Sequence, residues 1–326
     1  MSAVRCDDNM TNTFLHQHIA VLLNEAIDQL VTTPRGVYVD ATFGRGGHTR
    51  ALLNKLNAAG RVIAFDKDLE AVCYANTHIQ DPRFTIFHRS YAHLSSVLAT
   101  LQLTGGVDGI LFDLGVSSPQ LEESERGFSF VREGKLDMRM DQSQGQTAMA
   151  WLSTVEEAEL ATVLWQYGEE RYARRIAKAI IMARNHAPIE TTTALAEIIK
   201  KAMPAFSKKT SHKHPATRCF QAIRIAINQE LVELEQGLAQ ALAMLKKGGR
   251  LAVISFHSLE DRMVKQFVTL HEKGIALPFK LPVKPQAFSH LQQLKKIGKP
   301  IKPSDKEILL NPSARSAILR IAEKVS

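Results

Sequence analysis

A glycine-rich turn and an aspartate downstream of it are the first residues whose types and spacing could do chemistry. The segment D-A-T-F-G-R-G-G-H, residues 40–48, follows a short apolar run and precedes a helical pattern. Its glycines let the backbone turn tightly and approach a ligand, and the first amides of the following helix lack partners. Asp66 ends the next apolar run about 20 residues on, where a carboxylate can accept both hydroxyls of a ribose. The pattern predicts an adenosine-bearing cofactor; a turn that only packs helix on strand is the alternative.

The spacing of the glycines indicates which cofactor is bound. A dinucleotide site usually carries G-x-G-x-x-G, whose third glycine brings the helix close to the strand under a pyrophosphate. This chain has G-x-G-G instead. The spacing therefore favours S-adenosylmethionine, with its amino acid part against the turn, over NAD and an oxidoreductase.

Two later segments place polar side chains where a methyl donor would meet its target. Asp113 ends the fourth apolar run and precedes the small and polar residues L-G-V-S-S-P-Q. A fifth run ends in S-F-H-S, residues 255–258. Because open parallel sheets bind ligands at the carboxyl ends of their strands, we expect both segments near the glycine turn.

Apolar runs that alternate with helical patterns must position these residues. The alternation predicts an α/β fold with a mostly parallel, doubly wound sheet. The expected strands are residues 37–40, 61–66, 84–88, 107–113 and 250–256, with helices over 49–56, 69–78 and about 226–245. Residues 147–202 read as consecutive helices. We therefore expect residues 1–140 and 215–326 to form one discontinuous cofactor-binding domain, interrupted by an all-helical domain at 141–214.

The charges of the chain are unevenly distributed. Residues 1–164 hold 13 Lys and Arg against 20 Asp and Glu, residues 165–224 hold 12 against 4, and residues 225–326 hold 16 against 9. Basic side chains that displace counterions supply affinity for a polyanion, so the pattern favours a nucleic acid partner. A solvated basic face is the alternative.

Nine segments, taken in order, resemble one family. The chain is similar to the bacterial 16S ribosomal RNA cytosine-N4 methyltransferases over about residues 16–322. The segments are H-I-A-V-L-L-N-E-A (18–26), D-A-T-F-G-R-G-G-H (40–48), D-L-G-V-S-S-P-Q-L (113–121), R-G-F-S-F (126–130), L-D-M-R-M-D (136–141), Y-G-E-E-R (167–171), K-H-P-A-T-R-C-F-Q-A-I-R-I (213–225), S-F-H-S-L-E-D-R (255–262) and N-P-S-A-R-S-A-I-L-R (311–320). The resemblance implies a Rossmann-like class I methyltransferase fold with a helical insertion, and N4 methylation of a cytidine in the decoding region of 16S ribosomal RNA.

The resemblance also implies a set of cofactor contacts. Carried over by position, they are Gly46, Gly47, His48, Asp66, Tyr91, Asp113 and Gln120. An aromatic residue at Tyr91 could equally belong to the core. The chain departs from the family at Ala20, where proline is more common. It also lacks the Asp/Asn-Pro-Pro-aromatic motif of many amino-methylating enzymes, which leaves the residues that hold the base unassigned.

Methylation of an exocyclic amine needs an acceptor for its proton and in-line positioning. The candidates for the catalytic role are Asp113 first, then Ser255 and His257. A role for Asp113 in cofactor binding alone, and a structural role for His257, are the alternatives. No metal is expected, because the histidine pairs of the sequence have no third ligand nearby.

Basic residues in and beside the insertion are the expected RNA contacts. They are Arg171, Arg174, Arg175, Lys178, Lys208, Lys209, Lys213, Arg218 and Arg224. Phe128, Phe130 and Phe220 could stack on a splayed base or be buried. The expected partner is 16S ribosomal RNA or the small subunit, in the cytoplasm and without a membrane, and a homodimer is possible. A non-catalytic ribosome-assembly factor is the remaining alternative function.

Overall fold

The computed structural model describes residues 20–204, 214–273 and 292–326. The chain divides into two compact units. The sheet unit comprises residues 1–115 and 234–326, and the helical unit comprises residues 116–233. Lys208, Lys209 and Lys213 lie outside the described residues.

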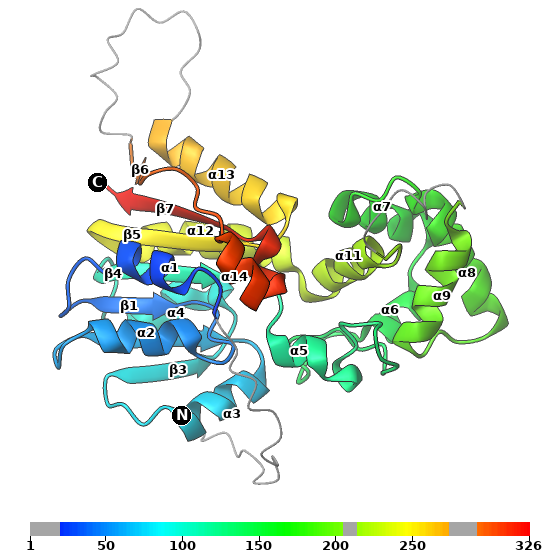
Figure 1. Cartoon of the computed structure of the whole chain (residues 1–326), viewed down its shortest axis with the longest axis horizontal. Helices are drawn as coiled ribbons and strands as arrows, with labels where there is room; N and C mark the ends of the chain where they lie inside the picture. The colour runs from blue at the N-terminus through cyan, green and yellow to red at the C-terminus, as the bar shows by residue number, and fades with distance from the viewer. Residues whose placement is uncertain (1–19, 205–213, 274–291) are drawn as a thin grey trace, which may run out of the picture. The chain divides into compact units, whose positions relative to one another are not determined.

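One seven-stranded sheet in the order β3-β2-β1-β4-β5-β7-β6 organises the sheet unit (Figure 1). β1 to β5 pair in parallel, whereas β7 is antiparallel to both β5 and β6. The strands are β1 (Val37–Asp40), β2 (Arg61–Asp66), β3 (Phe84–His88), β4 (Val107–Asp113), β5 (Leu245–Ser255), β6 (Leu294–Lys296) and β7 (Ile318–Lys324). The predicted mostly parallel, doubly wound sheet is confirmed, and β6 and β7 extend it.

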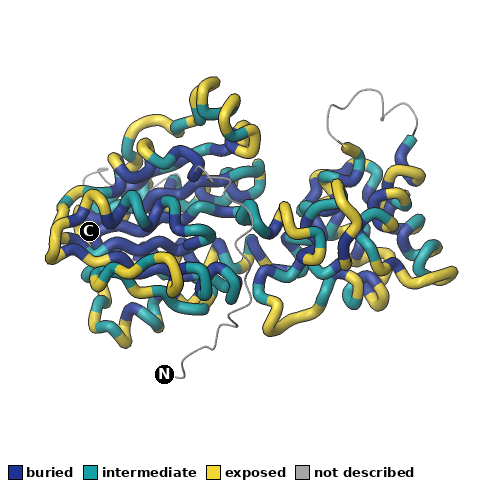
Figure 2. The backbone as a smooth tube through the Cα atoms, turned by 60° about the horizontal axis from the view of Figure 1, so that its bottom comes forward, coloured by how far each residue is buried: buried dark blue, intermediate teal, exposed yellow. Residues whose placement is uncertain are grey.

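Helices cover both faces of this sheet because successive strand side chains point to opposite faces. Ile110 and Phe112 pack with residues of α4, α12 and α13, whereas Leu111 between them packs with residues of α1 and α2. In Figure 2 the dark blue stretches of the tube mark the buried residues of the chain. The helices of this unit are α1 (Leu23–Leu30), α2 (Gly47–Lys55), α3 (Leu69–His78), η1 (Tyr91–His93), α4 (Leu94–Thr100), α12 (Glu230–Met244, begun in the helical unit), α13 (Ser258–Lys273), α14 (Asp305–Leu310) and η4 (Pro312–Ser316).

The helical unit has a separate apolar core. Its helices are α5 (Ser118–Glu122), η2 (Ser124–Arg126), α6 (Ala148–Thr154), α7 (Glu157–Gly168), α8 (Ala173–His186), α9 (Thr192–Ala202) and α11 (Thr217–Asn228). The unit is wider than the expected 141–214. Leu136 and Met138 before that range, and Cys219 and Phe220 after it, are buried in the same core as Leu164. Hydrophobic burial therefore places the unit boundaries after Gly115 and Glu233.

Within the residues that the structure describes, no helix has the length and the apolar character needed to cross a membrane.

Candidate functional site

Four polar side chains stand at the carboxyl ends of neighbouring strands. Asp66, Asp40, Asp113 and Ser255 end β2, β1, β4 and β5, which are adjacent in that order. Parallel pairing aligns these ends, since Asp40 is in register with Leu111 of β4 and Asp113 with Ile254 of β5. The topology thus gathers residues that lie as many as 215 positions apart in the sequence at one edge of the sheet.

The glycine turn leads directly from β1 into α2. Gly44 and Gly46 have φ of 57° and 72°, in the left-handed region that favours glycine. A Cβ on Gly46 would lie 2.7 Å from the ring of Phe43, and one on Gly47 would lie 2.8 Å from the Cβ of Ala20. The turn has no room for side chains at these positions, and it leaves the first amides of α2 at the sheet edge.

Asp66 closes the turn from the side of β2. Its Oδ2 accepts a hydrogen bond from the Gly44 amide at 2.8 Å, and its Oδ1 accepts one from the Asp68 amide at 2.9 Å. Burial, with a further contribution from the negative charge of Asp68, raises the pKa of Asp66 to about 6. The two hydrogen bonds act in the opposite direction. Each oxygen keeps a second lone pair, so the carboxylate can still accept ribose hydroxyls.

Asp40 connects the turn to the neighbouring strand. Its Oδ2 accepts from the Thr49 hydroxyl at 2.7 Å, and its Oδ1 accepts from the Thr42 amide at 3.2 Å. The Thr42 hydroxyl in turn accepts from the Asp113 amide at 2.7 Å. Burial raises the pKa of Asp40 to about 6, although its hydrogen bonds act in the opposite direction.

Asp113 and His48 face each other at this edge. Asp113 Oδ2 lies 3.5 Å from His48 Nδ1, and Asp113 Oδ1 is buried without a hydrogen-bond partner in the described part of the chain. The His48 ring is 5% exposed, and its Nε2 lies 3.2 Å from the carbonyl oxygen of Val21. Burial, followed by the charges of Asp40 and Glu260, raises the pKa of Asp113 well above its usual value.

Ser255 and His257 have different surroundings at the end of β5. The Ser255 hydroxyl is buried without a hydrogen-bond partner among the residues described. His257 Nε2 lies 3.1 Å from Glu260 Oε1 but has no hydrogen-bond partner among the described residues. The His257 amide donates to Glu260 Oε2 at 3.3 Å, and His257 Nδ1 accepts from the Glu260 amide at 3.4 Å. These two bonds tie His257 to the start of α13, which is compatible with the structural alternative for this residue.

Tyr91 and Gln120 lie on different units. Tyr91 follows β3, is half-buried, and packs its ring edge-to-face on Phe112 with centroids 5.3 Å apart. Gln120 is buried in α5 of the helical unit, where its side-chain oxygen accepts from the Ser117 amide at 3.0 Å and completes a capping box. Gln120 thus has a structural role that the sequence analysis missed.

Exposed cations gather on and beside α8. Arg174, Arg175 and Lys178 are exposed on this helix, and Arg171 is exposed just before it, over the ring of Tyr172. Arg218 is also exposed and donates to the carbonyl oxygen of Glu169 at 3.2 Å.

Arg224 differs from these expected RNA contacts. Its guanidinium donates two hydrogen bonds of 2.8 Å to the carboxylate of Glu230. Both side chains are largely buried, so this bidentate pair corrects the expectation of a phosphate contact at Arg224. Phe128 and Phe220 are buried in the core of the helical unit, and Phe130 packs on Phe220.

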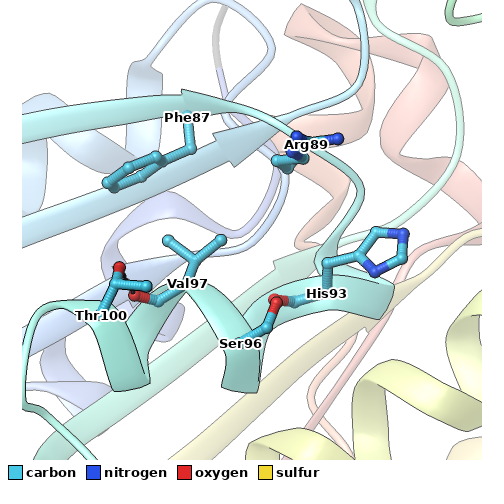
Figure 3. A pocket seen from close by; sticks show the side chains of 6 residues that line it. All are labelled: Phe87, Arg89, His93, Ser96, Val97 and Thr100. Carbon is cyan, nitrogen blue, oxygen red and sulfur yellow. Dashed lines mark hydrogen bonds between the residues drawn. The ribbon is translucent and has the colours of Figure 1, made fainter. Parts of the chain in front are cut away.

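A pocket of about 280 Å³ opens between β3 and α4 (Figure 3). Its lining is Phe87, Arg89, His93, Ser96, Val97 and Thr100. None of the predicted site residues that the structure describes lines this pocket.

The sequence analysis missed Asp40, Thr42 and Glu260. Asp40 ends a strand just as Asp66 and Asp113 do, so the rule that located those two residues could have located it. The sequence has no comparable signal for Thr42 and Glu260, because their roles arise from hydrogen bonds and charges that only the folded sheet brings together.

Comparison with known proteins supplies a family for this arrangement. A family model described as the MraW methylase family matches residues 15–325. A relative named ribosomal RNA small subunit methyltransferase H from Idiomarina loihiensis is 55% identical over 95% of this chain and 97% of its own length. A relative of the same name from Pseudoalteromonas atlantica is 53% identical over 94% of this chain and 98% of its own length. The crystal structure of an rRNA methylase from Streptococcus thermophilus aligns with 94% of this chain and 93% of its own, at 12% identity and a TM-score of 0.39.

Proposed function

Because the chain belongs to the MraW methylase family, we propose that it methylates the N4 amine of a cytidine in the decoding region of 16S ribosomal RNA. As a member of this family it is a methyltransferase that uses S-adenosylmethionine, which confirms the cofactor prediction and is incompatible with an NAD-dependent oxidoreductase. The names of the two relatives support the small-subunit ribosomal RNA as substrate. The cytoplasm, where ribosomes are assembled, is the expected place of action.

The residues at the sheet edge fit S-adenosylmethionine. The turn at Gly46 and Gly47 excludes side chains and presents the first amides of α2, including that of His48, to the amino acid part of the cofactor. Asp66 would accept the ribose hydroxyls. Tyr91 is proposed beside the adenine, and Gln120 remains a proposed cofactor contact on the basis of the sequence resemblance alone.

The observation that carries the proposal is the buried oxygen of Asp113. Asp113 Oδ1 and the Ser255 hydroxyl are buried polar atoms at the ends of adjacent strands, and neither has a hydrogen-bond partner among the described residues. Native proteins rarely leave such atoms unsatisfied unless a ligand completes them. An amine that donates to Asp113 Oδ1 would satisfy the carboxylate.

S-adenosylmethionine supplies an electrophilic methyl group on a sulfonium. The N4 nitrogen of cytidine is a poor nucleophile, since its lone pair is conjugated with the ring. A hydrogen bond from this amine to Asp113 would increase the electron density on nitrogen and fix its direction of attack. Ser255 would hold the base from the neighbouring strand.

The exposed cations of the helical unit would bind the RNA backbone. Arg171, Arg174, Arg175, Lys178 and Arg218 are accessible to phosphates. Lys208, Lys209 and Lys213, outside the described residues, are proposed contacts on the basis of sequence alone. Arg224 is left out because Glu230 already engages its guanidinium.

Transfer of labelled methyl groups tests this function. Small subunits from cells that lack the gene are incubated with labelled S-adenosylmethionine, and the nucleosides of the product are separated. We expect N4-methylcytidine with the unaltered protein and at least a hundredfold less with Asp113→Ala. Asp28→Ala, an exposed aspartate of the same unit, is the matched control and should retain activity. Bound cofactor without any methyl transfer would favour a non-catalytic assembly factor.

A further inference from the structure

The ring of His48 is fixed in one orientation beside Asp113. Its Nε2 lies 3.2 Å from the Val21 carbonyl oxygen, which can only accept, so Nε2 carries a hydrogen. The chain around Val21 is itself held in place: the Leu22 amide donates to Glu307 Oε1 at 2.6 Å, and Ala20 packs against Gly47. Nδ1 is therefore the ring nitrogen that faces Asp113 Oδ2, at 3.5 Å.

These two atoms can share one proton. In a neutral ring with its hydrogen on Nε2, Nδ1 has a lone pair that accepts from a protonated Asp113. In an imidazolium, Nδ1 instead donates to the Asp113 carboxylate. Both arrangements hold a single proton between Nδ1 and Oδ2, and both leave the pair with no net charge.

The groups around the pair determine when this proton is retained. Asp40 of β1 and Glu260 of α13 add negative charge near Asp113, and Asp66 of β2 interacts with Asp40. Loss of the proton would give the pair of His48 and Asp113 a net negative charge beside Asp40 and Glu260. This is unfavourable without a cation nearby, so the pair keeps its proton. A sulfonium at the same edge would reverse this preference, because it offsets the negative charge.

We propose that His48 and Asp113 form one proton-holding pair, which loses its proton when S-adenosylmethionine binds and takes one from the target amine during methyl transfer. The proposal rests on the function proposed above. His48 acts through Asp113 and is therefore a positioning residue, whereas Asp113 contacts the amine.

The charges balance in this scheme. Before transfer, the sulfonium carries one positive charge and the deprotonated pair one negative charge. The lone pair of N4 forms the new N–C bond, the electrons of the C–S bond remain on sulfur as a neutral thioether, and the N4 proton moves to the Asp113 carboxylate. A half-turn of the carboxyl group brings that proton to Nδ1. The pair and the sulfur together carry no net charge in either the reactant or the product state.

Proton release on cofactor binding tests the proposal without RNA. Titration calorimetry at pH 7 in two buffers of different ionisation enthalpy counts the protons released when S-adenosylmethionine binds and when S-adenosylhomocysteine binds. We expect about one more proton released with the sulfonium form than with the thioether, because only the sulfonium offsets the charge of the pair. Equal release for the two ligands would overturn the proposal and assign Asp113 to the amino acid part of the cofactor.

Three variants locate the proton. Asp113→Asn should abolish the difference between the two ligands. His48→Gln, whose amide can still donate to the Val21 carbonyl, should reduce it at least twofold and shift the pH profile of kcat, while KM for the cofactor changes little. His93→Gln, an exposed histidine of the same unit, is the matched control. Binding of S-adenosylhomocysteine reports that each variant is folded.

Two results would contradict this assignment. An unchanged proton count in His48→Gln would make the histidine merely structural. A difference that survives in Asp113→Asn but disappears in Asp40→Asn would place the proton on Asp40. Because the binding measurement needs no methyl acceptor, these results stand even if transfer to cytidine fails.

Discussion

Individual aspartates at the sheet edge bind protons more tightly in the folded chain than in the unfolded chain. Asp40 has a folded pKa of about 6 against an ordinary value of 3.8. Between these values the folded state binds more protons, so the free energy of unfolding falls as the pH rises from about 4 to about 6. For one such group the loss reaches about 3 kcal/mol. The site therefore retains ionisable groups at the expense of stability.

Asp40→Asn should flatten this pH dependence. The amide oxygen can still accept from the Thr49 hydroxyl and the Thr42 amide, but the side chain no longer ionises. Between pH 4.5 and pH 7, we expect the free energy of unfolding to fall by about 2 kcal/mol less in the variant than in the unaltered protein. Urea unfolding of the sheet unit at several pH values measures the difference. Parallel curves for the two proteins would contradict the buried titration of Asp40.

Single residues differ in how far the sequence could place them. Asp66 and Asp113 were predictable because each ends an apolar run, and parallel strands bring such ends together. The burial of Ser255 and the pairing of Arg224 with Glu230 were not, since both depend on packing between distant segments. A cation in a helical pattern has the same sequence signature whether it faces solvent or a buried carboxylate.

At the scale of elements, the segment before α1 and the start of α2 position the site jointly. Gly47 lies in a helix and has no positive φ, so its role is steric. A Cβ there would meet the Cβ of Ala20 at 2.8 Å and push away the segment that holds the His48 ring. This contact explains why the opening segment of the chain belongs to the site although it has no group that reacts.

Gly47→Ala should weaken cofactor binding, and Ala20→Gly should restore it. Overpacking of this kind typically destabilises by about 1–3 kcal/mol. We expect roughly tenfold weaker binding of S-adenosylhomocysteine in Gly47→Ala, and at least partial recovery in the double variant, because glycine at position 20 removes the clashing methyl group. Calorimetry on the four proteins of the cycle measures the coupling. Additive effects would show that the contact with Ala20 is not the cause.

The elements themselves were largely predictable, with instructive exceptions. The first four predicted strands coincide with β1 to β4, because short apolar runs between helical patterns identify buried parallel strands. The helix expected over about 226–245 is instead broken between α11 and α12 at Gln229, whose φ is 51°. A left-handed residue that is not glycine has no signature in a single sequence. β7 was missed because the two strands that pair with it, β5 and β6, are not joined to it by a short turn, so the sequence has no hairpin signal there.

At the scale of the whole molecule, the structural units do not coincide with the acidic and basic parts of the sequence. Residues 116–233 contain 16 Lys and Arg and 15 Asp and Glu, so the helical unit is almost neutral overall. Attraction of RNA to this unit must then come from the local arrangement of cations around α8 rather than from net charge. Charge counts along the sequence could not reveal this, because folding places the acidic residues 116–164 in the same unit.

Removing the exposed cations of α8 should reduce the salt dependence of RNA binding. In the variant with Arg174, Arg175 and Lys178 all changed to alanine, we expect the slope of log affinity against log salt to decrease by about 2–3, since each lost phosphate contact removes nearly one unit. Filter binding of small subunits at four salt concentrations gives this slope. Lys201→Ala, an exposed lysine of α9 in the same unit, is the control and should change the slope little. Cofactor binding should be unaffected, because the groups proposed to hold the sulfonium and the ribose lie in the sheet unit. An unchanged slope in the triple variant would exclude α8 as the RNA-binding element.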